Sequence, residues 1–90
     1  MERKEVYVVI DSEREYQNNL PDSRSVMKGN LSQGDRMILI EECLDRARKA
    51  WYNEPGKSLS SVSEQFRKIA ALCVQDAEQN GMPKRELQTI

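Results

Sequence analysis

The feature of this sequence that most limits its fold is a pair of apolar repeats separated by the dipeptide Pro55-Gly56. In both repeats the apolar residues recur at intervals of three and four positions, which places them on one face of an α-helix. The first repeat consists of Met37, Ile40, Leu44, Ala47 and Trp51, and the second of Val62, Phe66, Ile69, Cys73 and Ala77. We therefore expect two long helices, over about residues 33–53 and 61–80, that form an antiparallel hairpin.

Local signals predict where these helices begin and end. Ser32 with Asp35, and Ser61 with Glu64, fit the capping patterns of helix N-termini. Proline and glycine end the first helix, and the Asn-Gly pair at 80–81 ends the second.

The N-terminal stretch VYVVI, residues 6–10, is rich in β-branched residues but has no second strand to pair with. Because an isolated strand is unstable, we expect a helix from about residue 4 to 19. A polar loop over 20–32 and a C-terminal tail over 81–90 complete a single domain. The predicted fold is all-α: a short N-terminal helix followed by a long antiparallel helical hairpin.

The composition predicts self-association and excludes several classes of partner. Ninety residues with 38% hydrophobic content fill only a modest core, so we expect a homo-oligomer. Fourteen basic against fifteen acidic residues give a net charge of −1, which argues against a binder of double-stranded DNA. No stretch has the length of a membrane span, and we expect a soluble, intracellular protein without a membrane partner.

Acidic residues gather on the first hairpin helix, at Glu41, Glu42 and Asp45. Magnesium requires several hard oxygen ligands that converge from facing elements. Local ion pairs are the competing interpretation, because Arg46 and Lys49 follow Glu42 and Asp45 by four residues.

The facing helix weakens the metal interpretation. It offers Glu64 and, farther along, Asp76. However, Arg67 and Lys68 follow Glu64 by three and four positions, which is one helical turn. Positive charges repel a cation from the place where it would bind. Histidine is absent, and the two cysteines, Cys43 and Cys73, are expected to be reduced core residues and not zinc ligands.

Three other features fit a nucleotide or another anion. Lys28 and Asn30 lie in a loop that leads into a helix N-terminus, where backbone N–H groups attract phosphate. Tyr16, with Arg14 nearby, precedes this loop and offers an aromatic face to a base, and Tyr7 is a weaker candidate of the same kind.

The third feature is a side face of the last helix. Arg67, Ala71 and Val74 lie on it, away from the main apolar repeat, and predict a subunit interface that encloses an anion.

The segments VIDSEREYQ, IEECLDRARKAW and FRKIAALCVQDAEQNGMPKR resemble short phage-encoded MazG-like proteins over most of the chain. MazG is an all-helical nucleoside triphosphate pyrophosphatase that holds magnesium with paired acidic helices. The resemblance implies a metal set of Glu41, Glu42, Asp45 and Glu64, but Arg67 stands where the second acidic pair should continue.

The layout of a first helix, a basic loop and a long hairpin is also similar to the phage anti-CBASS sponge proteins. That family forms helical oligomers that trap cyclic oligonucleotide messengers of bacterial immunity. The resemblance implies that Tyr16, Lys28 and Arg67 contact the ligand.

Our leading hypothesis is a non-enzymatic counter-defence protein that binds cyclic di- or trinucleotides intact, without a cofactor, in the cytoplasm of an infected bacterium. The alternatives are a magnesium-dependent MazG-like pyrophosphatase and a non-catalytic helical interaction module.

Overall fold

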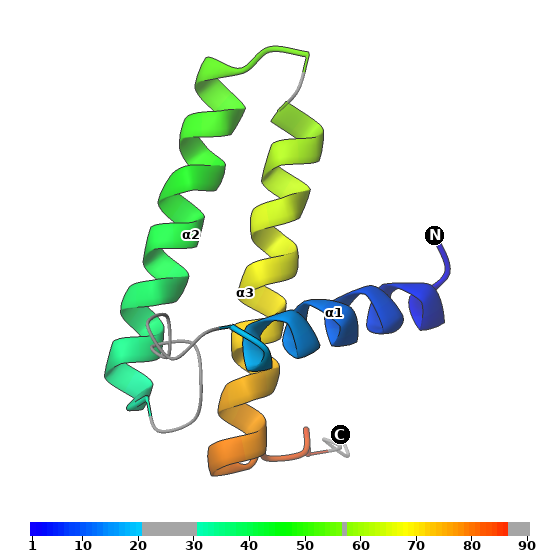
Figure 1. The fold of residues 1–90 in the computed structure, drawn as a ribbon, viewed down its shortest axis with the longest axis vertical. Helices are drawn as coiled ribbons and strands as arrows, with labels where there is room; N and C mark the ends of the chain where they lie inside the picture. The colour runs from blue at the N-terminus through cyan, green and yellow to red at the C-terminus, as the bar shows by residue number, and fades with distance from the viewer. Residues whose placement is uncertain (21–30, 57, 87–90) are drawn as a thin grey trace.

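The computed structural model describes residues 1–20, 31–56 and 58–86, which form three α-helices and no strand. The helices are α1 (Arg3–Asn18), α2 (Gln33–Asn53) and α3 (Ser58–Asn80). The all-helical class expected from the sequence is thereby confirmed. Helices α2 and α3 lie side by side and run in opposite directions, while α1 crosses α3 (Figure 1). Within the described part of the chain, no helix is both long and apolar enough to cross a membrane.

The helix ends follow from local chemistry, with one correction. Ser32 caps α2 as predicted, because its hydroxyl accepts a hydrogen bond of 3.0 Å from the backbone N–H of Asp35. Gly56 and Gly81 have φ of 91° and 80°, a left-handed conformation that favours glycine after a helix. The predicted start of α3 at Ser61 was wrong: the helix already begins at Ser58, so Ser61 lies within it.

The buried face of α2 is rotated relative to the predicted one. Cys43, Ala47 and Ala50 are buried, whereas Met37 and Trp51, expected to pack inward, are 59% and 62% exposed. Small side chains let two helix backbones approach closely, and a large side chain on the same face would separate them. The close contact with α3 therefore selects the face that carries alanine and cysteine.

The same rotation applies to α3. Ala71 and Leu72 are fully buried, whereas Phe66 and Cys73 of the predicted repeat are exposed. The prediction that both cysteines are core residues holds for Cys43 and was wrong for Cys73, and both thiols are free.

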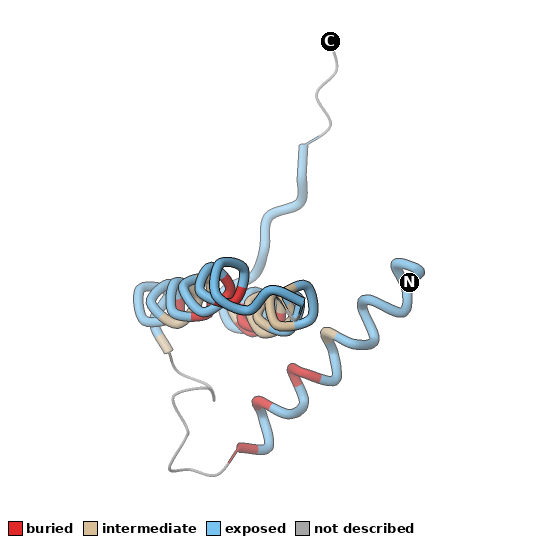
Figure 2. Tube along the Cα trace, turned by 90° about the horizontal axis from the view of Figure 1, so that it is seen from above, coloured by how far each residue is buried: buried red, intermediate tan, exposed pale blue. Residues whose placement is uncertain are grey.

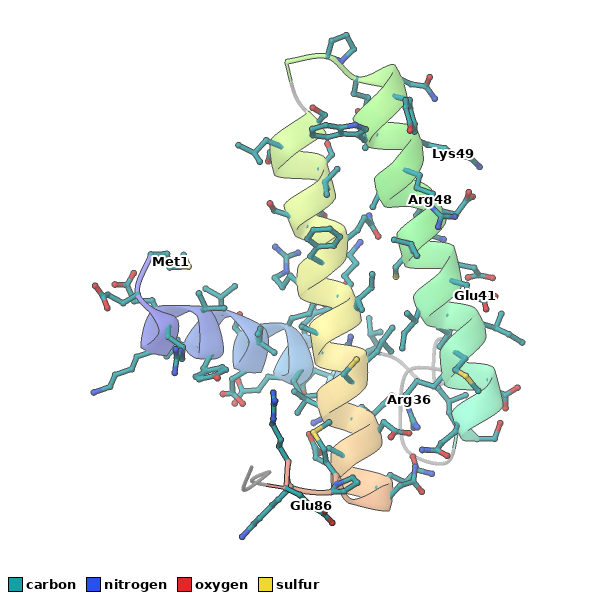
Figure 3. All side chains as sticks on the ribbon, turned by 180° about the vertical axis from the view of Figure 1, so that it is seen from behind. Met1, Arg36, Glu41, Arg48, Lys49 and Glu86 are labelled. Atoms are coloured by element: carbon teal, nitrogen blue, oxygen red, sulfur yellow. The ribbon has the colours of Figure 1, made fainter. Side chains whose placement is uncertain are left out.

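Arg36 ties the start of α2 to the end of α3. It is only 2% exposed, and Figure 3 shows it between the two helices. Its Nη1 lies 2.6 Å from Oδ1 of Asp76, and its Nη2 lies 2.6 Å from Oε1 of Gln79. Its Nε donates to Gln75 Oε1 at 3.2 Å, and Nη2 also donates to the carbonyl of Leu31 at 3.4 Å. This network joins α2 to α3 at the end of the helix pair that is farthest from the connection between them.

The Asp76 carboxylate is held in its ionised form by this network. Hydrogen bonds from Gln33, Asn80 and Arg36 lower its pKa below the ordinary value of an aspartate. A carboxylate whose pKa is lower in the folded state stabilises the fold above its ordinary pKa. That contribution is lost as the pH falls through the lowered value.

Two ion pairs hold α1 against α3. In one of them α1 supplies the acidic residue, and in the other it supplies the basic residue. Glu13 Oε1 lies 2.7 Å from Arg67 Nε, and Arg14 Nε lies 2.9 Å from Glu78 Oε1. Ala71, one turn from Arg67 on the same face, is fully buried and leaves room for α1. The side face of α3 that we expected at a subunit interface is therefore covered, at Arg67 and Ala71, by the chain's own first helix.

Only the second half of α1 is buried by this crossing. Figure 2 shows its buried residues confined to that half, and residues 1–9 are all exposed. The radius of gyration is 15.0 Å, against about 12 Å for a compact domain of this length. The molecule is thus open, with the first half of α1 projecting as an arm.

Replacing Arg36 with methionine is expected to lower the free energy of unfolding by about 2–3 kcal/mol, because the buried Oε1 of Gln75 loses its bond from Arg36 and Oε1 of Gln79 loses a partly buried one. Urea unfolding followed by circular dichroism measures the difference. Arg48→Met is the matched control, since Arg48 is an exposed arginine on the same helix. Equal stability of the two variants would contradict a stabilising role for the Arg36 network.

Candidate functional site

The acidic residues of α2 do not assemble into a metal site with α3. Glu41, Glu42 and Asp45 are all exposed, and Figure 3 shows Glu41 pointing away from α3. Asp45 forms the predicted ion pair with Lys49, at 3.0 Å, whereas the predicted Glu42–Arg46 pair does not form. Across residues 1–20, 31–56 and 58–86, no three cysteine or acidic side chains come together as a metal ion would require.

The acidic residues of α3 are engaged elsewhere. Glu64 lies 3.9 Å from Arg67 and 3.8 Å from Lys68, and Asp76 belongs to the Arg36 network. Arg67, which we expected to face the carboxylates of α2, turns instead towards Glu13 of α1. Lys68 is the α3 cation that lines a pocket together with Glu42.

The candidate ligand residues fall into three groups. Lys28 and Asn30 lie outside the described residues. Arg14 and Arg67 form ion pairs between α1 and α3. Arg14 is 8% exposed and donates hydrogen bonds to Glu78 and Asn18. Both arginines therefore help to build the fold, whatever else they contact.

The two tyrosines of α1 are the remaining candidates, and they differ in their surroundings. Tyr7 is 63% exposed on the projecting half of α1. Tyr16 is 59% exposed but also lines a pocket of about 270 Å³ where all three helices meet. We call this hollow the three-helix pocket. It is lined by Glu13, Tyr16 and Gln17 of α1, by Leu39, Glu42, Cys43 and Arg46 of α2, and by Lys68 and Leu72 of α3.

The three-helix pocket combines an apolar floor with charged walls. Leu72 is fully buried and Leu39 half-buried, so they supply apolar surface below the exposed ring of Tyr16. Arg46 forms no hydrogen bond or ion pair within the described residues, and Lys68 has only the 3.8 Å contact with Glu64. Two cations with little else to bind thus lie beside one aromatic ring.

Two carboxylates also line the pocket, and only Glu42 lowers this positive charge. Glu13 is neutralised by Arg67, and Glu42 is exposed one turn before Arg46. The pocket can accept a small ligand that combines a flat ring with a negative charge, because rings favour aromatic and aliphatic walls and phosphate favours arginine and lysine.

Cys43 lines the same pocket, and its thiol is expected to be unreactive. Burial raises the pKa of its thiol, although the nearby Arg46 and Lys68 act in the opposite direction. A thiol that stays protonated is a poor nucleophile. Cys43 therefore contributes packing surface, and its thiol is a poor nucleophile at neutral pH.

Sequence reasoning identified Tyr16 but missed its neighbours in the pocket. Gln17, Arg46 and Lys68 look like ordinary polar residues of amphipathic helices, and their meeting depends on how α1 crosses α3.

Comparison of the chain with protein-family models, with curated proteins and with solved structures found no match.

The two cysteines are expected to react at very different rates with iodoacetamide at neutral pH. Cys73 is exposed and should be alkylated first, whereas burial keeps Cys43 protonated and covered. Mass spectrometry of proteolytic peptides after timed quenching measures both rates. Chain unfolded in urea is the control, in which the two rates should converge, and equal rates in the folded protein would refute the burial of Cys43.

Proposed function

We propose that this protein is a phage counter-defence protein that binds cyclic di- or trinucleotides without cleaving them, in the cytoplasm of an infected bacterium. The observation that carries the proposal is the exposed ring of Tyr16 at a pocket with two available cations, Arg46 and Lys68. Base stacking on an aromatic ring combined with cations for the phosphates is how proteins hold nucleotides without reading sequence. The resemblance in layout to the sponge family agrees with this chemistry.

The scattered carboxylates of α2 and α3 support binding over hydrolysis. A pyrophosphatase of the MazG type needs acidic residues from two helices around its magnesium, whereas Glu42 lies beside Arg46 and Lys68. Cations at this place attract a phosphate and repel a metal ion.

We further propose that the protein acts as a homo-oligomer of such helical hairpins. The chain exposes 7381 Å², whereas a folded monomer of this mass exposes about 5,400 Å². The excess of about 2,000 Å² exceeds the roughly 800 Å² that each partner buries in a standard interface.

The occupant that best fits the excess surface is the arm of a second copy. A groove of about 640 Å³ lies between the first halves of α1 and α3, with Val6, Val9, Ile10 and Phe66 among its lining residues. Val6 and Val9 are partly exposed, and Tyr7 and Val8 of the same arm are largely exposed. An apolar arm beside an apolar groove is self-complementary, as a symmetric interface requires.

The wild-type protein is expected to retain cyclic dinucleotides or trinucleotides through ultrafiltration and to release them intact after proteolysis. Tyr16→Ala should weaken binding by about 1–3 kcal/mol, the usual contribution of one stacked base. Isothermal titration calorimetry measures the loss. Tyr52→Ala is the control, because Tyr52 is an exposed tyrosine at the far end of α2.

Glu42→Gln separates binding from hydrolysis. Removing this carboxylate beside Arg46 should leave the binding of an anion unchanged or make it tighter, whereas it would abolish a magnesium-dependent pyrophosphatase. Linear products, pyrophosphate release from nucleoside triphosphates, or no retention of any cyclic nucleotide would contradict the proposed function.

Phe66→Ala is expected to shift the protein towards the monomer, because it removes an exposed aromatic ring from the groove, a change that costs about 2 kcal/mol in a central interface position. Sedimentation velocity at several protein concentrations measures the shift. Trp51→Ala, which removes a larger exposed ring outside the groove, serves as the control. A wild-type protein that stays monomeric at every concentration would disprove the oligomer.

A further inference from the structure

Gln17 is a buried polar side chain that has no partner. It is 1% exposed, and within the described part of the chain neither its amide oxygen nor its amide nitrogen has a hydrogen-bond partner. The other buried polar side chains of the described residues are bonded: Glu13 to Arg67, Arg14 to Glu78, and Gln75 to Arg36. The half-buried Gln65 has one covered atom without a partner, its amide oxygen, whereas both amide atoms of Gln17 lack one. Buried polar groups in folded proteins are almost always satisfied, so an unsatisfied amide calls for a functional explanation.

The position of Gln17 supplies one. Gln17 is one of the residues that line the three-helix pocket, together with Tyr16 and the buried Leu72, and its two amide atoms are covered. An amide presents a donor next to an acceptor. A nucleobase edge presents the complementary pair, which is how glutamine recognises bases in nucleic acids.

The charges and the size of the pocket limit what else the ligand carries. Arg46 and Lys68 lie on the wall, opposed by the single unpaired carboxylate of Glu42. The volume of about 270 Å³ is slightly below that of most ligand pockets, which are roughly 300–1,000 Å³. A pocket of this size favours a ligand unit with a single base.

We infer that the three-helix pocket binds a single nucleotide unit, with the Gln17 amide paired to the base edge, Tyr16 against the base, and Arg46 and Lys68 against the phosphate. The class of ligand rests on the proposed function. The unit is either one base of a cyclic oligonucleotide or a free mononucleotide, since both present the same chemistry.

Access to the amide requires a side chain of the wall to move, because both amide atoms are covered. Tyr16 and Arg46 are exposed and form no hydrogen bond or ion pair within the described residues. An outward rotation of either side chain would break no such interaction.

Gln17→Met tests the inference, because it keeps the shape of the side chain and removes its polar atoms. Replacing an unsatisfied buried amide with an apolar isostere should raise the melting temperature, while binding of adenosine monophosphate and guanosine monophosphate falls at least tenfold. Calorimetry and thermal unfolding provide the two readouts. Unchanged nucleotide binding, or a melting temperature below that of the wild type, would overturn the inference.

Arg46→Gln provides a second test on an exposed residue, where folding is not at risk. It should weaken adenosine monophosphate at least fivefold and leave adenosine unaffected. Ribose 5-phosphate, which lacks a base, should bind the wild type at least tenfold more weakly than adenosine monophosphate. Equal binding of these two phosphates would show that the pocket takes phosphate alone, which contradicts pairing with Gln17.

Cyclic di-adenylate separates this inference from the proposed function. If the wild type binds the cyclic dinucleotide and Gln17→Met binds it equally well, the proposed function stands and the role of Gln17 is refuted. If the wild type binds mononucleotides through Gln17 but no cyclic nucleotide, the pocket stands and the proposed function fails.

Discussion

The arrangement of this protein depends on the crossing of α1 over α3. Adjacent residues of opposite charge on α1, Glu13 and Arg14, meet Arg67 and Glu78 on α3, with the buried Ala71 between these positions. Reversing α1 would place like charges together, and sliding it would separate both pairs, so the two pairs favour this direction and register. The three-helix pocket and the groove beside the arm exist only because α1 is held at this place.

The interior is unusual in how much of it is polar. Among the described residues, six apolar side chains are buried, and five buried polar side chains accompany them. Arginines and glutamines whose donors and acceptors are matched give directional contacts that a few alanines and leucines do not. The fold therefore combines a thin apolar core with specific polar contacts, and leaves large apolar residues such as Trp51, Phe66 and Leu59 outside.

The sequence was sufficient to predict three helices, the cap at Ser32 and the glycines that follow α2 and α3, because these depend on neighbouring residues. It was not sufficient to predict which face of each helix is buried. Apolar residues occupy several faces of α2 and α3, and the choice among them depends on how closely the backbones approach. Arg36 and Gln17 were missed for a related reason, since nothing in their local sequence distinguishes a buried polar residue from an exposed one. Of the site, Tyr16 was identified from its aromatic side chain, whereas its partners come from other helices.

The ion pair between Arg67 and Glu13 also has a thermodynamic consequence. Glu13 is 7% exposed, so an anion that takes Arg67 for itself leaves a buried carboxylate without its cation. The affinity of such an anion and the docking of α1 are then linked reciprocally, each weakening the other by the same free energy. Binding of an anion at Arg67 would therefore weaken the docking of the whole first helix.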